Sequence, residues 1–479
     1  MIRNLKSKLK AMSSSSPSLN HGQGSAASPP NEPGSSLEDG IRINGAFDYV
    51  EVNRSREKNN TDDSDNKHHV KAHTADNKIH TSLENHIKAR GDFGGQIVEE
   101  ADGFFVRKRT IYEINTSYGK INLSGLMTSE FPNSRWWTRL NQNLHSRDIV
   151  FLDTETTGLA GGTGTYAFLI GLGYVTDQGL VIEQYLMRDF DEEYPMLQSV
   201  MKTLKKFRVL ITFNGKSFDW PLLESRLVYS RLGTITWEDA HLDLLHTSRR
   251  LWGQRLESCS LSSIEKSILS HVREDDIPGS QIPGIYFDYL ENRNPDMMKR
   301  VIQHNEWDIA AMAALLLHVN SLYQDPMGRG DAYELLGAAK ELERNYKIQE
   351  AAACYQRCIQ ISQKHSLTVE AKKRLAYLKK RYEGPEEAMD IWIDLIKEEG
   401  NLLIFPLIEM AKYLEHGKKD FQKALKCTDR AILLADARSG NSSKLREELF
   451  ARRRRLIRKL ERSLRNGVEG FEGGQFSIS

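Results

Sequence analysis

A run of apolar residues that ends in two acids constrains the fold of this chain more than any other feature. Residues 149–158 are IVFLDTETTG, in which Asp153 and Glu155 follow four apolar residues. A short continuous apolar run is typical of a buried strand, and side chains two positions apart on a strand point to the same side of the sheet. The two carboxylates therefore converge and can share one hard cation. A strand end with two hydrated acids is the alternative.

Two further segments supply acids that can join this pair. Residues 209–226, VLITFNGKSFDWPLLESR, predict a short buried strand, a turn at Asn214, and a helix with Asp219 near its start. Residues 301–317, VIQHNEWDIAAMAALLL, have apolar residues at helical spacing. His304 and Asp308 are one turn apart on that helix, so they share a face.

The three segments together resemble the three motifs of the DEDD exonucleases. In that family the motifs are D-x-E, then N-x-x-x-F-D-x-P, then a histidine or an aromatic residue ahead of Asp on a helix. Their counterparts here, in the same order, are Asp153-Thr154-Glu155, Asn214 with Phe218-Asp219-Trp220-Pro221, and His304 with Asp308. The joint pattern is far more specific than any one motif.

More narrowly, the chain resembles the YprB-type bacterial proteins over about residues 103–426. The resemblance rests on DTETTGLAGGTGTYAFLIGLG, LESCSLSSIE, an IPG sequence, residues 286–290 and a helical tail. It implies an α/β fold, with a ribonuclease-H-like mixed sheet flanked by helices and then an all-α helical-repeat domain.

The resemblance also implies roles for individual residues. Asp153, Glu155, Asp219 and Asp308 would hold two divalent cations, Mg²⁺ or Mn²⁺, with Asp153 bridging both. Two cations can activate the attacking water and neutralise the leaving oxygen of a phosphodiester. His304 would be the general base, and an ordinary polar contact of a helix histidine is the alternative. His304 stands four residues before Asp308, the step of the tyrosine subfamily, whereas the histidine subfamily has five.

Candidate substrate contacts lie beside the acids. Thr154 belongs to the first motif, and Asn214 could hydrogen-bond the scissile nucleotide or cap the following turn. Phe218 is a candidate for substrate binding, with helix packing as the alternative. The glycine-rich residues 158–164 predict a turn that lets backbone approach the 3′-terminal nucleotide, or a plain hairpin connection. Asp243, which ends another expected strand, stays outside the metal set because it has no motif of its own.

Composition says more about where the protein is located in the cell than about the reaction it catalyses. The chain has 66 basic and 65 acidic residues, a balance that neither supports nor excludes binding to nucleic acid. Four cysteines are too few for a disulfide framework, and Cys354 and Cys358 suit helix packing better than zinc. No apolar run approaches the roughly 20 residues that cross a bilayer, and the N-terminus lacks a secretory signal. We therefore expect a cytoplasmic protein with no membrane partner.

Shifts in composition and periodicity predict four regions. Residues 1–95 are polar and predict a disordered low-complexity tail. Residues 96–325 would form the ribonuclease-H-like DEDD exonuclease domain. It would begin with a β extension at 103–138, where FFVRKRTIYEI and YGKINLSGL suggest a hairpin. Within the domain, residues 260–269 predict a helix, and IPGSQIPGIYFDYL predicts a loop at the mouth of the cleft. Residues 326–466 would be tetratricopeptide-like, and 467–479 a flexible C-terminus.

The helical region shows a degenerate repeat. A small residue is followed four positions later by a larger one at Ala351 and Tyr355, Ala388 and Trp392, and Ala424 and Thr428. The spacings of 37 and 36 residues are close to the tetratricopeptide period. Such repeats typically bind a protein partner, and the resemblance implies a helicase; covering one side of the nuclease is the competing role. The segment RRRRLIRKL could contact phosphates or pack through its leucines.

These observations predict a metal-dependent exonuclease that shortens DNA from its 3′ end, in DNA repair, with nucleic acid as its substrate partner. An exoribonuclease on the same scaffold is the first alternative, because the acids act on phosphates and do not select the sugar. A catalytically silent scaffold protein is the second. It would be expected to lack some of the four acids.

Overall fold

The computed structural model describes residues 90–128, 131, 144–158, 164–237, 240–398, 403–437 and 443–472. The chain separates into two compact units, Met1–Asp92 and Phe93–Ser479. Almost all of the first unit, and with it most of the predicted low-complexity tail, lies outside the described residues, as do residues 159–163 of the glycine-rich segment. The fold described below is therefore that of the second unit.

A seven-stranded mixed sheet forms the centre of the first part of this unit. The strand order is β1-β2-β7-β6-β5-β8-β9. The strands are β1 (Gln96–Glu100), β2 (Gly103–Glu113), β5 (Ile149–Thr156), β6 (Ala167–Thr176), β7 (Gly179–Leu186), β8 (Val209–Thr212) and β9 (His241–Asp243). Neighbours from β1 to β5 pair antiparallel, whereas β5, β8 and β9 are parallel. The sheet, its flanking helices and the helical region that follows confirm the predicted fold class.

The first two N-terminal strands extend this sheet, and the next two form a small hairpin of their own. FFVRKRTIYEI lies in β2, which pairs with β1 on one side and with β7 on the other. YGKINLSGL contributes to the short strands β3 (Ser117–Tyr118) and β4 (Ile121–Asn122), which pair with each other, and to α3 (Gly125–Thr128). The predicted pairing of the two segments is wrong, because alternation identifies a half-buried strand without identifying its neighbour.

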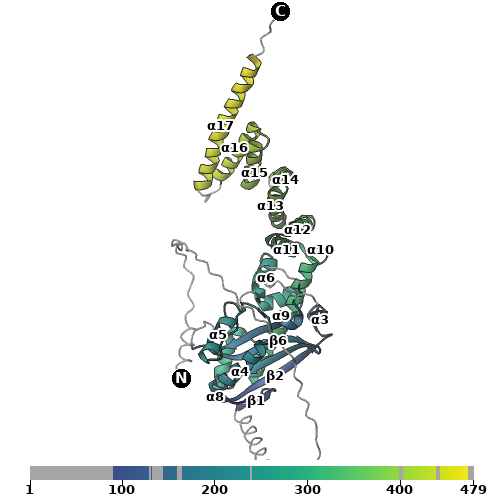
Figure 1. Cartoon of the computed structure of the whole chain (residues 1–479), viewed down its shortest axis with the longest axis vertical. Coiled ribbons are helices and arrows are strands. Elements are labelled where there is room, and N and C mark those ends of the chain that lie inside the picture. The colour runs from purple at the N-terminus through teal and green to yellow at the C-terminus, as the bar shows by residue number, and fades with distance from the viewer. Residues whose placement is uncertain are drawn as a thin grey trace, which may run out of the picture. The chain divides into compact units, whose positions relative to one another are not determined.

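Helices cover both faces of the sheet. On β7 the side chain of Gln184 reaches α9 (Asp296–Gln324), where its Nε2 donates to the backbone oxygen of Ile302 at 2.7 Å. The next residue, Tyr185, contacts Thr203 on α4 (Glu193–Leu204) through its hydroxyl at 2.9 Å. Successive side chains of a strand point to opposite faces. Therefore α9 and α4 lie on opposite sides of the sheet, as Figure 1 shows.

Two glycines on β6 let α9 lie close to the sheet. A Cβ added at Gly171 would stand 2.3 Å from Oδ1 of Asn305, and one at Gly173 would stand 2.3 Å from Cγ2 of Ile309. Both contacts are far inside van der Waals distance, so a side chain at either position requires the side chain of Asn305 or Ile309 to move. The spacing between helix and sheet thus depends on glycine at both positions.

The segment after β9 contains several short helices. It forms α6 (Leu244–Trp252), α7 (Leu261–Ile264), a π-helical turn η3 (Glu265–Leu269), a 3₁₀ turn η4 (Gly279–Gln281) and α8 (Ile282–Asn292). The helix predicted at 260–269 is confirmed as α7 with η3, and its Ile264 and Ile268 are buried. The loop predicted for IPGSQIPGIYFDYL is wrong for residues 282–290, which lie in α8. Pro283 is in the first turn of that helix, where its missing N–H costs nothing.

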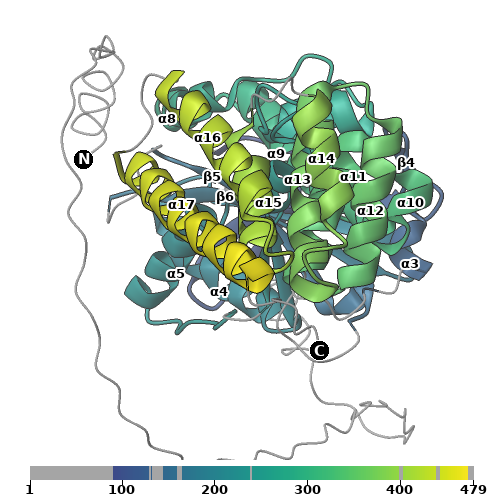
Figure 2. The same ribbon diagram turned by 90° about the horizontal axis from the view of Figure 1, so that it is seen from above.

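After α9 the chain is entirely helical across its described residues. The helices are α10 (Pro326–Arg329), α11 (Ala332–Arg344), α12 (Ile348–Ile361), α13 (His365–Tyr382), α14 (Met389–Glu398), α15 (Ile404–His416), α16 (Phe421–Ala437) and α17 (Ser443–Glu472). From α10 to α17, each helix of the series contacts the next or the next but one, and Figure 2 shows these helices in the green to yellow part of the ribbon. The paired small and large residues of the degenerate repeat are all buried in or beside α12, α14 and α16. The tetratricopeptide assignment stays a prediction.

The basic segment of α17 packs against α15. Leu456 is fully buried, and Arg452, Arg455 and Lys459 surround the carboxylate of Glu415 at 2.6 to 2.9 Å. Burial alone would raise the pKa of Glu415, but hydrogen bonds from Arg455 and Lys459 outweigh it and lower the pKa to about 2. Part of the positive charge of RRRRLIRKL is therefore neutralised within the fold. No described helix combines the length and apolarity needed to span a membrane.

Candidate functional site

The first two predicted acids lie on the α9 face of β5. Asp153 and Glu155 are both partly exposed there, while the strand before them is buried. The Nδ2 of Asn305, on α9, donates to Oδ2 of Asp153 at 2.8 Å, and Nε2 of Gln184 donates to Oδ1 of Asn305 at 2.9 Å. The fully buried Asn305 thus fixes the Asp153 carboxylate. Sequence reasoning missed Asn305, although its place one turn before Asp308 was a usable signal.

Asp219 reaches the same strand from α5 (Asp219–Tyr229), of which it is the first residue. Its Oδ1 accepts hydrogen bonds from the backbone N of Thr154 at 3.1 Å and from Oγ1 of Thr154 at 2.6 Å. Thr154 was predicted to bind substrate. In this structure its hydroxyl and its backbone N–H both hold Asp219 in place.

The last predicted acid, Asp308, lies on α9 beside a buried arginine. Nη2 of Arg273 is 2.5 Å from Oδ1 of Asp308 and also 2.7 Å from Oε2 of Glu265. Burial lowers the pKa of Arg273, but the carboxylates of Asp308 and Glu265 outweigh that effect and raise it. Arg273 therefore stays charged next to the acids. It lies in a loop between η3 and η4 whose sequence has no periodicity, and the motifs gave no indication of it.

His304 lies between two carboxylates. Its Nδ1 is 2.7 Å from Oδ1 of Asp276, and its Nε2 is 3.7 Å from Oδ2 of Asp308. A carboxylate on Nδ1 fixes both the ring orientation and the tautomer, which leaves Nε2 as the nitrogen nearest the acids. Burial would raise the pKa of Asp276, but the hydrogen bond to His304 and the charges nearby lower it. Asp276, like Arg273, was not predicted.

The acids repel one another. Burial and the charges of Asp308 and Asp219 raise the pKa of Asp153 well above its ordinary value. Burial, Asp153, Asp308 and Asp219 do the same for Glu155. Burial also raises the pKa of Asp219, and the hydrogen bonds from Thr154 limit the rise to about 6. These carboxylates come from three separate segments and lie close enough to shift each other's ionisation.

This charge pattern fits divalent cations. Carboxylates that are buried together favour added positive charge, and carboxylate oxygen is the ligand that Mg²⁺ and Mn²⁺ prefer. The side chains are not arranged around an ion: within the described ranges, no three His, Cys, Asp or Glu side chains form a group that could hold a metal. Asp308 is paired with Arg273, and Asp219 with Thr154. The backbone brings the acids together, and Asp308 would have to leave Arg273 to bind a cation.

A pocket of about 390 Å³ opens beside His304 and Asp308. Its wall includes Ile277, Pro278 and Gly279, the first residues of the segment predicted to lie at the mouth of the cleft. That prediction therefore holds for the position of these residues, although the rest of the segment is helical. The pocket offers space for a ligand next to the acids.

The remaining predicted residues have different surroundings. Asn214 has a left-handed backbone with φ of 66°, and its N–H donates to Oδ1 of Asp243 at 2.8 Å. Asp243 is buried, and its carboxylate also accepts hydrogen bonds from the backbone N of Lys216 and of Leu245, the second of which caps α6. These contacts account for the buried carboxylate without a metal. Phe218 is 54% exposed. The packing alternative for Phe218 is therefore wrong, and its ring is available to a ligand.

A second contact ties α9 to the N-terminal strands. Glu306 accepts hydrogen bonds from Nζ of Lys108 at 2.9 Å, from Oγ1 of Thr110 at 3.1 Å and from the hydroxyl of Tyr112 at 3.2 Å. All three donors lie on β2 and point to the same face. The helix that carries His304 is thus anchored to β2 as well as to β6.

Comparison with known proteins identifies the family to which this chain belongs. The model of the RNase H superfamily matches residues 150–320, the part of the chain that holds all four acids. The chain is also 34% identical over 322 residues to YprB, an uncharacterized protein of Bacillus subtilis (strain 168). The match covers 66% of this chain and 76% of that protein. The chain therefore belongs to the YprB family of RNase-H-like proteins.

Among solved structures, the family B DNA polymerase from the hyperthermophilic archaeon Pyrobaculum calidifontis aligns with 47% of this chain at 14% identity and a TM-score of 0.29. The aligned part is 29% of the polymerase chain. A similarity of this degree does not define a shared fold.

Proposed function

We propose that this protein is a metal-dependent exonuclease that hydrolyses a DNA strand from its 3′ end. The observation that carries the proposal is the meeting of Asp153, Glu155, Asp219 and Asp308 within an RNase-H-like fold. Burial raises the pKa of three of them, and repulsion from the other acids adds to the rise for Asp153 and Glu155. Such a cluster is costly to fold unless it serves to bind positive charge. The polarity and the DNA preference come from the resemblance to the DEDD family.

In this proposal the acids hold two divalent cations. Asp153, Glu155 and Asp308 would hold one of them, and Asp153 and Asp219 would hold the other. When bound, the cations lower the pKa of the attacking water and neutralise the leaving oxygen. Asn305 keeps the Asp153 carboxylate oriented, and Thr154 does the same for Asp219. Asp308 would join the set if its carboxylate left Arg273, whose guanidinium could then pair with a phosphate of the substrate.

His304 acts as the general base. Its Nδ1–H donates to Asp276, so Nε2 carries the lone pair and accepts the proton of the attacking water. The adjacent pocket, with Pro278 and Gly279 in its wall, receives the terminal nucleotide. The exposed ring of Phe218 provides a face on which a base can stack.

The exoribonuclease remains the second candidate on the same residues, because no described contact tests for a 2′-hydroxyl. A role in DNA repair, with a helicase as the partner of the helical region, is also inferred from the resemblance alone. The silent scaffold predicts missing acids, and all four are present.

The direct test is an assay on 5′-labelled DNA and RNA, single and double stranded, with the full chain and Mg²⁺ or Mn²⁺. We expect a ladder of shortened DNA that EDTA abolishes. Asp153→Asn should slow it at least about 100-fold, because even the outer partners of metal ligands typically account for 10- to 100-fold. Asp177→Asn, a change of the same chemistry at an exposed acid, is the matched control. His304→Gln should slow cleavage while Mn²⁺ binding, followed by calorimetry, persists.

Each result separates the candidates. Shortening of RNA alone would favour the exoribonuclease. Release of the labelled 5′ nucleotide at once, without a ladder, would contradict the proposed polarity. If no substrate is shortened, or if Asp153→Asn shortens it as fast as the wild type, the nuclease proposal is wrong and the scaffold is favoured.

A further inference from the structure

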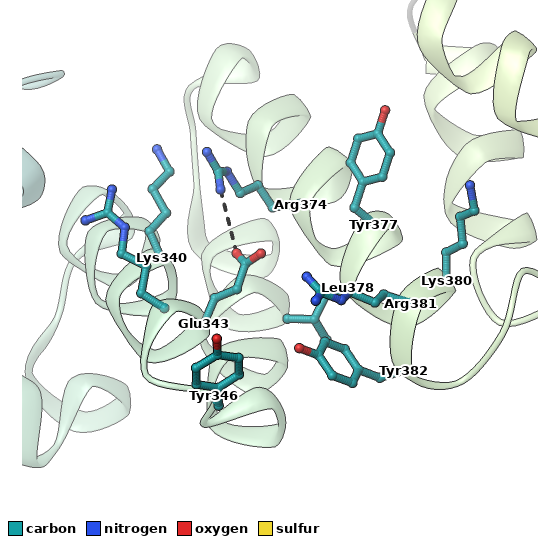
Figure 3. A pocket seen from close by; sticks show the side chains of 10 residues that line it. Lys340, Glu343, Tyr346, Arg374, Tyr377, Leu378, Lys380, Arg381 and Tyr382 are labelled. Carbon is teal, nitrogen blue, oxygen red and sulfur yellow. Dashed lines mark ion pairs between the residues drawn. The ribbon is translucent and has the colours of Figure 1, made fainter. Parts of the chain in front are cut away.

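A pocket of about 630 Å³ lies between α11 and α13, in the helical region that follows the candidate nuclease site. Five of its ten lining residues are Lys or Arg and three are Tyr. Figure 3 shows these side chains around the pocket, with Arg374 and Glu343 joined by an ion pair. We call this pocket the α11–α13 groove. Its volume is in the range of ligand-binding pockets.

The positive charge of the groove is only partly compensated. Arg374 pairs with Glu370 at 2.9 Å, Arg344 pairs with Glu341 at 3.3 Å, and Lys380 pairs with Glu409. The other two cations, Lys340 and Arg381, form no ion pair with any carboxylate that the structure describes. Burial lowers the pKa of Lys340, and the charges of Arg374 and Arg344 lower it further, against the charge of Glu370, which raises it. Cations that repel one another in a concave surface attract an anionic ligand.

Three tyrosines of the groove are unusually exposed. Tyr346 is 67% exposed, Tyr377 is 41% and Tyr382 is 47%. Large aromatic side chains normally gain stability by burial, so three exposed rings in one pocket indicate a ligand that offers flat surfaces. The guanidinium of Arg381 lies 5.4 Å from the ring centre of Tyr382, which places a charge and a stacking face together.

A second pocket, of about 240 Å³, continues the positive surface. It shares Lys340, Arg344 and Arg374 with the groove and adds Arg249 and Arg250 from α6. The shared side chains make the two pockets neighbours. A row of cations therefore extends from α6 past α11 to α13, longer than a single phosphate needs.

We infer that the α11–α13 groove binds a single strand of nucleic acid, with phosphates at its Lys and Arg side chains and bases stacked on its tyrosines. Cations that follow a backbone, interleaved with aromatic rings, are what binding of an unpaired strand requires. An acidic protein segment would satisfy the cations but would have no flat surface to place against the exposed parts of the three rings. The inference deepens the proposed function, on which it rests for the kind of polymer, by giving the substrate strand a second binding site.

The test measures binding of a fluorescent oligothymidylate to the full chain by anisotropy, in EDTA so that no cleavage occurs. Lys340→Gln/Arg381→Gln removes two unpaired cations of the groove. We expect weaker binding, and a slope of log K against log salt that is smaller by about 1.4, since each phosphate contact of a single strand contributes about 0.7. Arg357→Gln/Lys397→Gln is the matched control. It removes two exposed cations on α12 and α14 that lie outside the groove.

A second pair of variants separates stacking from charge. Tyr377→Ala/Tyr382→Ala should weaken binding about tenfold with little change in the salt slope, whereas Tyr377→Phe/Tyr382→Phe should bind as the wild type does. An abasic oligonucleotide of the same length should not distinguish the Ala variant from the wild type. Thermal melting of each variant shows whether it is folded.

The inference is overturned if the groove variants bind the oligothymidylate as the wild type does. It is also overturned if poly-glutamate binds the groove as tightly and is as sensitive to the tyrosine changes, since the ligand would then be an acidic protein. The result is independent of the cleavage assay. Binding at the groove without cleavage would contradict the nuclease alone, and cleavage without groove binding would contradict this inference alone.

Discussion

Asp219 shows how the candidate site affects the stability of the protein. Burial raises its pKa from 3.8 to about 6 despite the hydrogen bonds from Thr154. Between these two values the folded protein holds a proton that the unfolded chain has lost. The free energy of unfolding therefore falls as the pH rises through this window, and the loss is complete above it.

We accordingly expect the melting temperature of the metal-free protein to fall as the pH rises from about 4 to about 6, because Asp219 then loses its proton in the folded state. Asp219→Asn should reduce that fall, and saturating Mn²⁺ should raise the wild-type melting temperature at pH 7 by mass action. Differential scanning fluorimetry in EDTA, across pH 4 to 8, measures both effects. Identical pH profiles for variant and wild type would show that Asp219 does not cause the change in melting temperature.

The residues of the site differ in how far the sequence could predict them. The acids were predictable because each belongs to a motif with fixed spacing on a strand or a helix. Arg273 and Asp276 were not, because they lie in a loop whose contacts depend on how η3 and α9 pack. Asn305 lies in the predicted helix, but its role depends on Gly171, on a strand far away in the sequence. Tertiary contacts of this kind have no local signal.

At the scale of elements, the approach of α9 to β6 decides whether the acids meet. Gly171→Ala would place a methyl group against the Asn305 side chain, and overpacking of this kind typically costs about 1–3 kcal/mol. We expect a lower melting temperature and a greater loss of cleavage than the stability change explains, because Asn305 orients Asp153. Gly284→Ala, at an exposed position of α8 with nothing within 4 Å, is the control and should be neutral or slightly stabilising. Equal activity of the two variants would contradict this account.

The elements themselves were predictable where periodicity was strong. β5, β8 and α9 follow directly from apolar runs and from helical spacing. The start of α8 was missed because its proline and glycine normally mark loops, whereas a first-turn proline is compatible with a helix. The neighbour of β2 was missed because strand pairing is a property of the whole sheet.

At the scale of the whole molecule, the ribonuclease-H-like part and the helical region share a buried contact. The indole Nε1 of Trp252, on α6, donates to Oε1 of Glu334, on α11, at 2.9 Å, and Trp252 is fully buried. Gly337 continues the contact, since a Cβ there would stand 3.0 Å from the backbone of Arg250 and Leu251. Residues on both sides of the predicted domain boundary at 325 and 326 therefore depend on each other.

A fragment that ends at residue 325 should consequently be less stable than the same part within the full chain. It would lose α11 and expose Trp252, and burial of a large apolar side chain contributes about 1.5–3 kcal/mol. We expect a lower melting temperature and binding of a hydrophobic dye. Within the full chain, Glu334→Ala should reproduce part of the loss and Glu334→Gln less of it. A fragment as stable as the full chain would mean that the two parts fold independently.

The ion pair between Arg273 and Asp308 gives the proposed metal site a resting state. Arg273 belongs to the protein itself, so Asp308 has a positively charged partner even when divalent cations are scarce. Taking up a cation is then an exchange of one positive charge for another, and the measured affinity is the difference between two interactions. Such a site would release its cation without leaving Asp308 unpaired, because Arg273 would take the place of the cation.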